Sequence, residues 1–144
     1  MKASVKQIVS AYNTLGEAAV TKLEEGEAIK VVKARKAMRP IVEDYEAFLK
    51  DCQEKFKPEN WDSIQTKLQQ WQKEGEKTTL TEEERIEINK VVIEYQTKID
   101  KAVADELKKE HEINAEKFAD GTDVKLLLEN GWKSKQLDAI DILL

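Results

Sequence analysis

Apolar residues recur at helical intervals along two stretches of about thirty residues each. The first extends from about Glu27 to about Phe56, and the second from Thr81 to about His111. Placed about 100° apart, the apolar residues of the first stretch fall within an arc of about 120°; they are Val31, Ala34, Met38, Ile41, Val42, Tyr45, Phe48, Leu49, Cys52 and Phe56. The second stretch places on one face Ile88, Val91, Val92, Tyr95, Ile99, Ala102 and Val103.

Two amphipathic helices of matched length, each about 45 Å long, predict a long antiparallel helix pair. We expect this pair to bury the ridge to which Met38 and Tyr95 belong. Pro40 lies inside the first helix, where it lacks an N–H and crowds the carbonyl of Lys36. The apolar phase is nevertheless the same on both sides of Pro40, so we predict one kinked helix and not two.

Shorter helices are expected to flank this pair. Ser4 and Gln7 have the spacing of a capping box before a first helix that ends near Gly16. Thr81 and Glu84 repeat that spacing at the start of the second long helix. Between the long helices, a short helix with Asn60 as its candidate cap carries a stripe of Trp61, Ile64, Leu68 and Trp71.

The C-terminal part of the chain has a different pattern, with turn signals at Asp120-Gly121 and Asn130-Gly131. Two short helices are favoured there, and short strands around residues 112–118 and 124–128 are the alternative. The sequence therefore predicts an all-α fold, with a helical bundle domain over residues 1–118. Residues 119–144 form a small C-terminal appendage, either packed on the bundle or swapped between bundles.

Composition supports long solvated helices, because 37% of the residues are charged and only five are glycine. The net charge of −5 disfavours a dedicated nucleic-acid-binding protein, which usually has a basic excess. No apolar run approaches the roughly 20 residues of a membrane span, and polar residues interrupt the N-terminus where a signal peptide would be apolar. With one cysteine and no membrane partner expected, a cytoplasmic location is the default.

Candidate chemistry is sparse, and we expect no enzyme and no cofactor. The single histidine, His111, is predicted to lie far from the single cysteine, Cys52, which belongs to the apolar stripe. Zinc sites need several Cys or His ligands. Di-iron bundles need Glu-x-x-His pairs, whereas Lys108 stands three residues before His111.

One enzymatic alternative rests on carboxylates. Glu43-x-x-Glu46 and Glu59-x-x-Asp62 resemble the paired acidic motif of the all-α nucleoside triphosphate pyrophosphohydrolases. That resemblance implies Mg²⁺ held by these four residues and hydrolysis of a nucleotide to its monophosphate. Glu43 is predicted to point about 160° away from the centre of the apolar stripe, which favours solvated acids over an internal metal site.

Cations are concentrated in the first long helix, with no acid between Glu27 and Glu43. This basic run is a candidate docking face for an acidic partner or phosphate, or else a solvated helix back with an Arg39–Glu43 ion pair. It consists of Lys30, Lys33, Arg35, Lys36 and Arg39. Glu106, on the apolar face of the second long helix, either pairs with Lys30 or Lys33 or marks the point where that helix leaves the core.

Several apolar residues lie off the main stripes and are candidates for contact with a partner. Ile86 and Ile93 point to a second face of the long helix, and Trp132 is a candidate interface residue. The chain ends on three more candidates, Ile140, Leu143 and Leu144. Oligomerisation would cover them, so we expect a homo-oligomer.

As a whole, the chain resembles the small acidic helical proteins encoded among phage and prophage structural genes of gut bacteria. The resemblance rests on "AYNTL", "KARKAMRPIVEDYEAF", "EEERIEINKVVIEY" and "LLLENGWKSKQLDAIDILL". It implies a non-catalytic virion, tail-assembly or head-assembly role, in the host cytoplasm or the virion, and assigns no functional residue. We therefore expect a structural or interaction protein that acts through helix faces and self-association. A small acidic regulator that sequesters a basic protein partner is a further alternative.

Overall fold

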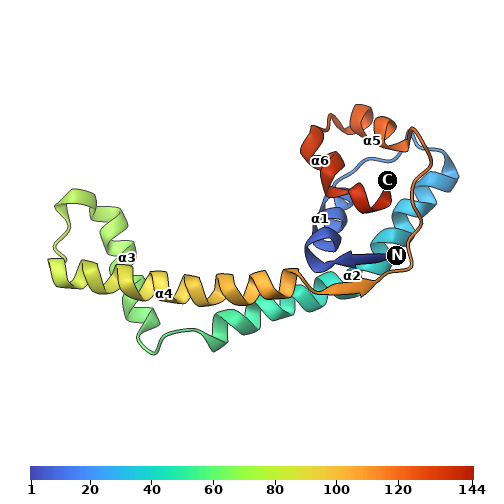
Figure 1. Ribbon diagram of the computed structural model, residues 1–144. Coiled ribbons are helices and arrows are strands. Elements are labelled where there is room, and N and C mark those ends of the chain that lie inside the picture. Colours follow the sequence, from blue (N-terminus) through green and yellow to red (C-terminus); the bar gives the residue numbers. More distant parts are fainter. The chain divides into compact units, whose positions relative to one another are not determined.

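The computed structural model describes all 144 residues and is mostly helical, which confirms the all-α prediction (Figure 1). A single two-stranded antiparallel sheet accompanies six α-helices and two short 3₁₀ turns. In chain order the elements are β1 (Lys2–Ser4), α1 (Val5–Gly16), α2 (Glu25–Lys55), α3 (Trp61–Glu74), η1 (Gly75–Lys77), α4 (Glu82–Leu107), β2 (Glu110–Glu112), α5 (Thr122–Asn130), α6 (Ser134–Ala139) and η2 (Asp141–Leu143).

The chain divides into two compact units. The first comprises Met1–Ala47 together with Asp105–Leu144, and the second comprises Phe48–Ala104. The long helices α2 and α4 therefore contribute residues to both units. The domain boundary predicted after residue 118 lies inside the first unit, because residues 119–144 belong to the same compact unit as the N-terminus. Exchange of these residues between molecules stays a prediction.

Helix α2 is continuous from Glu25 to Lys55 with Pro40 inside it, which confirms the prediction of one helix. Pro40 is exposed, so the carbonyl that loses its helical partner faces water and can be solvated there. Within the second unit, α4 runs antiparallel to the last part of α2, residues 48–55 (Figure 1). In the second unit the Tyr95 hydroxyl donates to the Gln53 carbonyl oxygen at 2.9 Å.

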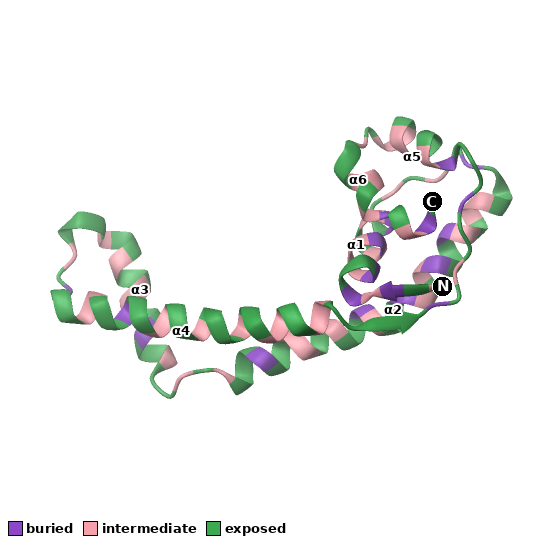
Figure 2. Ribbon diagram, in the orientation of Figure 1, coloured by how far each residue is buried: buried purple, intermediate pink, exposed green.

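The core of the first unit is made by α1, the first part of α2 and the C-terminal segment, and no α4 residue belongs to it. Met38 is fully buried there, so that part of the α2 stripe is covered by other elements than the predicted partner helix. Figure 2 shows the buried residues gathered on these elements. The buried members of this core are Ala3, Ile8, Ala11, Leu15, Leu23, Val31, Ala34, Met38, Val42, Ile113, Phe118, Leu126, Ile140 and Leu143.

The small sheet was missed by the sequence analysis. Helix α4 ends at Leu107, short of the predicted His111, because residues 110–112 pair with β1 in the register Lys2↔Glu112, Ala3↔His111 and Ser4↔Glu110. Strands of three residues with charged side chains show no apolar alternation from which they could be predicted.

Glu106 lies at this helix end. Its carboxylate pairs with Lys109 at 2.8 Å and not with Lys30 or Lys33. The expected pairing with Lys30 or Lys33 is therefore wrong, and Glu106 lies one residue before the end of α4 with its side chain only 18% exposed.

The sequence correctly predicted helix starts that depend on hydrogen bonds between residues three positions apart. Both capping boxes form, at Ser4–Gln7 and at Thr81–Glu84. Asn60 occupies the cap position of α3 but makes no capping hydrogen bond. The two short C-terminal helices are confirmed as α5 and α6, and the hairpin alternative is wrong.

The second unit has a much smaller core than the first. Three buried residues, Ile64, Leu80 and Ile88, are surrounded by partly buried Trp61, Leu68, Trp71, Val91 and Val92. Trp61 and Tyr95 stack with ring centroids 4.4 Å apart. Trp61 and Trp71, the two tryptophans of α3, therefore both pack against the core of the second unit, as their place on the apolar stripe of this helix predicts.

Two carboxylates join the N-terminal and C-terminal segments within the first unit. Glu27 accepts from the Lys30 ammonium at 2.9 Å through one oxygen. Through the other it accepts from the Ala119 N–H and the Thr122 hydroxyl, each at 3.1 Å. Its side chain is only 13% exposed. The bond with Lys30, ahead of the two other hydrogen bonds, lowers the pKa of Glu27 below its ordinary value.

Glu129 makes the reciprocal connection from α5 to the loop after α1. Its two oxygens accept from the backbone N–H groups of Thr21 and Lys22, each at 3.1 Å, and from the Thr21 hydroxyl. The Thr21 hydroxyl is the main cause of the lowered pKa of Glu129. Beside it, the Asn130 amide pairs with both backbone groups of Ala19. Each end of the chain therefore holds the other through side-chain to backbone bonds.

These carboxylates predict a loss of stability in acid. A lowered pKa means that the stabilisation is complete above the ordinary value near 4.5 and is lost as the pH falls through the lower folded value. The free energy of unfolding in urea should thus fall less between pH 6 and pH 3 in E27Q/E129Q than in the wild type. Glu25, exposed in the first turn of α2 and without an ion pair, provides the control E25Q. An unchanged pH dependence in E27Q/E129Q would contradict the role given to the two carboxylates.

Candidate functional site

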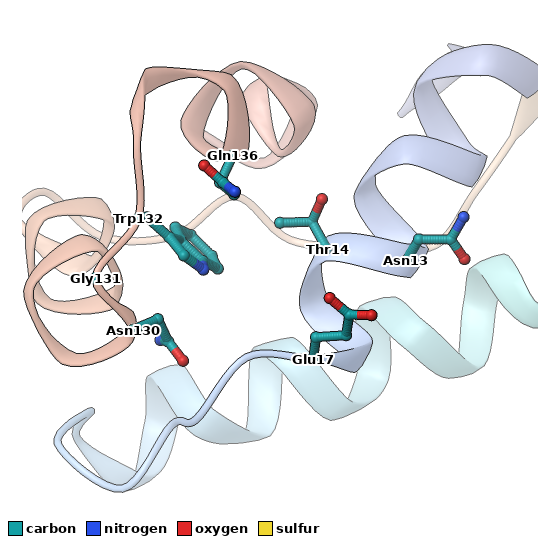
Figure 3. A pocket seen from close by; sticks show the side chains of 7 residues that line it. All are labelled: Asn13, Thr14, Glu17, Asn130, Gly131, Trp132 and Gln136. Atoms are coloured by element: carbon teal, nitrogen blue, oxygen red, sulfur yellow. The ribbon is translucent and has the colours of Figure 1, made fainter.

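A hollow of about 340 Å³ lies beside Trp132 in the first unit (Figure 3). It is lined from three helices and the turn between two of them, by Asn13, Thr14, Glu17, Asn130, Gly131, Trp132 and Gln136. Gly131 permits this arrangement because it adopts a φ of +62° directly after α5. In that left-handed conformation the chain reverses, and the Trp132 N–H donates to the Leu127 carbonyl at 3.0 Å.

Much of the polar lining of this hollow is engaged in holding the fold. The Asn130 side chain bonds to the Ala19 backbone, and the side-chain oxygen Oε1 of Gln136 accepts from the Lys133 N–H at 2.9 Å. Figure 3 shows the Trp132 ring and the Glu17 carboxylate turned toward the open space and Asn13 turned away from it. The hollow can accommodate a small polar group, and it contains no cysteine, histidine or lysine for nucleophilic chemistry.

A second hollow, of about 470 Å³, coincides with part of the basic run predicted from the sequence. Its lining is Lys30, Lys33, Lys36, Ala37, Asn114 and Glu116. One wall is therefore α2, and the other is the extended segment that follows β2. The fold thus turns a charge run on one helix into a groove with lysines along one side, which we call the lysine groove.

The structure separates the members of the basic run. Arg35 is partly buried, with its guanidinium carbon 4.2 Å from the centre of the Tyr12 ring and its terminal nitrogen close to Gly16. That cation–π contact packs α1 against α2. Lys33, Lys36 and Arg39 are exposed and available to a partner.

The apolar residues predicted to contact a partner differ in how far the fold buries them. Ile86 and Ile93 are 60% and 64% exposed on α4. Trp132 is half-buried against the core of the first unit, and Leu144 is 37% exposed. The expectation that Ile140 and Leu143 need an oligomer to cover them is wrong, because both are fully buried within their own chain.

The structure also exposes apolar residues that the sequence analysis did not select. Ile29 and Val32 lie near the start of α2, and Val124 and Leu128 lie one turn apart on α5. The apolar run "VKLLLEN" indicates the exposure on α5, because a short helix with apolar residues all round cannot bury every side. Leu126 takes the buried position and leaves Leu128 73% exposed.

The structure divides the four carboxylates of the pyrophosphohydrolase alternative between its two units. Glu43 and Glu46 belong to the first unit and Glu59 and Asp62 to the second, and all four are exposed. Nowhere does the structure bring together three or more His, Cys, Asp or Glu side chains able to hold a metal ion. Cys52 is a buried free thiol.

Comparison with known protein families, with curated proteins and with solved structures found no match to this chain. None of its helices combines the length and the apolar character needed to cross a membrane. The residues and geometry described above are therefore the basis for a functional proposal.

The exposed acids lead to a prediction about magnesium. Calorimetric titration with Mg²⁺ should show no saturable binding, because a hydrated Mg²⁺ ion needs several oxygen ligands around one point. Incubation with nucleoside triphosphates and Mg²⁺ should release no pyrophosphate. Release that is abolished in E43Q/E46Q but retained in E82Q/E83Q, a matched change of two exposed acids at the start of α4, would restore the enzymatic alternative.

Proposed function

We propose that the protein is a non-catalytic binding protein that self-associates through the exposed ridge of α4. A structural or assembly accessory role, of the kind implied by the resemblance to phage-encoded helical proteins, is consistent with this proposal. The observation that carries it is the pair Ile86 and Ile93, two large apolar side chains about two-thirds exposed on one helix face.

The small core of the second unit makes this exposure significant. Helix α4 has 26 residues and only one, Ile88, is buried. Its inner face packs on α3 through Ile88, Val91 and Val92, which uses the apolar residues nearest to α3. Ile86 and Ile93 point away from that contact, so no element of the unit covers them.

The spacing of the two isoleucines favours a second copy of the same helix as the occupant. Seven residues correspond to about 10.5 Å along the helix, the repeat at which residues recur along a helix–helix seam. A two-fold axis would place the same ridge on both partners and bury four isoleucines. Polar residues, Asn89, Lys90, Gln96 and Thr97, lie beside the ridge and would form the rim.

The expected association is weak. A fully buried isoleucine contributes about 1.5–3 kcal/mol, and these side chains are already partly covered. Four of them contribute about 6–12 kcal/mol at most, which is comparable with the roughly 4–15 kcal/mol that association costs in lost freedom of motion. The net free energy of association is therefore small, so the dimer should form at high local concentration.

Light scattering after gel filtration tests this proposal between about 10 and 500 µM. The wild type should change from one chain toward two as concentration rises, and I86Q/I93Q should remain at one chain with an unchanged helical spectrum. V124Q/L128Q is the matched control, since it removes two apolar side chains of similar exposure from α5 in the other unit. It should associate like the wild type.

Two results would contradict the proposal. A wild type that stays at one chain over the whole concentration range would exclude self-association. Equal loss of association in both double variants would show that the α4 ridge is not the contact. A monomer that captures one basic protein would instead support the acidic-regulator alternative, which the net charge of −5 favours.

A further inference from the structure

The lysine groove lies in the first unit and is separate from the α4 ridge, and its chemistry points to a different occupant. Three lysines and Ala37 of α2 line a hollow of about 470 Å³, together with Asn114 and Glu116 from the segment after β2. We propose that this groove binds an acidic helix of another protein, whose carboxylates pair with Lys33, Lys36 and Arg39. This inference goes beyond self-association and does not depend on it.

The first argument is that the cations are free. Lys30 is already held by the Glu27 carboxylate at 2.9 Å and the Lys117 carbonyl at 3.1 Å. Lys33, Lys36 and Arg39, by contrast, take part in none of the ion pairs or side-chain hydrogen bonds of the chain. The Arg39–Glu43 pair expected of a merely solvated helix back is absent from those ion pairs. The groove therefore presents charge that the fold does not use.

The second argument is electrostatic. The molecule carries 29 acidic residues against 24 basic ones, yet no acid interrupts α2 between Glu27 and Glu43. Like charges held one turn apart repel each other, a cost that an anionic ligand removes. Glu116 is the one acid in the lining and leaves the lysines in excess. An excess of one charge sign in a hollow also concentrates the field toward its ligand.

The third argument concerns the spacing, which distinguishes an acidic helix from phosphate. Lys33, Lys36 and Arg39 rise about 4.5 Å per step along α2, and acids three or four residues apart on a partner helix rise about 4.5–6 Å. Acids on one face of an extended chain would instead repeat at about 6.6–6.8 Å. Arg39 lies just outside the lining, and no glycine lines the groove, so the glycine-rich backbone loop that commonly holds phosphate is not present.

The small side chain of Ala37 completes the fit. It follows Lys36 directly and lies one turn after Lys33 on α2, and in the groove lining a larger residue there would hold a partner helix away from the lysines. The lysine stems supply apolar surface on either side of it. The site therefore combines some apolar surface with cations, as a docked amphipathic acidic helix requires.

The test uses a fluorescein-labelled peptide, EAAAEAAAEAAAEAA, and fluorescence anisotropy with the full-length protein at low salt. The wild type should bind, with affinity falling at least about tenfold between 20 and 200 mM NaCl as the ion pairs are screened. K33E/K36E should lower the affinity at least about tenfold, and K33Q/K36Q should have an intermediate effect. Both positions are exposed, and circular dichroism checks that the variants remain folded.

A matched control separates this site from general charge. K98E/K101E makes the same change in charge at two exposed lysines three residues apart on α4 and should bind the peptide nearly like the wild type. Equal loss in the two double variants, or no binding by the wild type at 20 mM NaCl, would overturn the proposal.

Two further measurements distinguish other occupants. Tripolyphosphate that displaces the peptide at concentrations well below those of sulfate at equal ionic strength would assign the groove to a phosphate ligand and overturn the acidic-helix proposal. Loss of self-association in K33E/K36E, measured by light scattering, would assign it to a second copy of this chain and would also overturn it. If I86Q/I93Q loses self-association and K33E/K36E retains it, the contact between copies does not use the lysine groove, which supports the groove proposal.

Discussion

Closure of the C-terminal segment over α1 and the first part of α2 is the packing on which the first unit depends. Leu126, Ile140 and Leu143 are fully buried against α1 and α2 residues. Each contributes about 1.5–3 kcal/mol, and together they match the 5–15 kcal/mol by which domains of this size are stable. Without these residues Ile8 and Met38 would face water, so the N-terminal half cannot be expected to fold alone.

The carboxylates of Glu27 and Glu129 give this closure its register. Each reaches across from its own segment to backbone N–H groups of the other, so both segments must be in place before either carboxylate has its partners. The buried side chains supply most of the free energy, whereas these directional bonds select one arrangement of the loops. The lysine groove is a product of the same closure, because its second wall is the segment that runs from β2 toward α5.

Helix periodicity and capping were predictable, because they depend on residues three or four positions apart. The long helices, both capping boxes and the continuity of α2 through Pro40 follow from such local signals. The partner of each apolar face was not predictable, since a stripe on α2 indicates that it is buried but not by which element. Met38 is consequently covered by α1 and the C-terminal segment, and Ile140 and Leu143, expected at an interface, are in the core.

The candidate binding surfaces were likewise predictable only in part. The exposure of Ile86 and Ile93 followed from their phase on α4, and the free charge of Lys33 and Lys36 followed from the missing acids on α2. The groove itself could not be foreseen, because Asn114 and Glu116 are far from residues 30–37 in the chain and reach α2 only through the fold. Function in this protein is thus proposed for surfaces that packing leaves uncovered.

Native-state hydrogen exchange with increasing denaturant tests the central claim, cooperative closure of the first unit, most directly. The amides of α5 and those of α1 should open with the same free energy and the same dependence on denaturant, because neither helix retains its core without the other. Exchange of α5 at a markedly lower free energy, with α1 still protected, would contradict this account and make the C-terminal segment a dispensable cover.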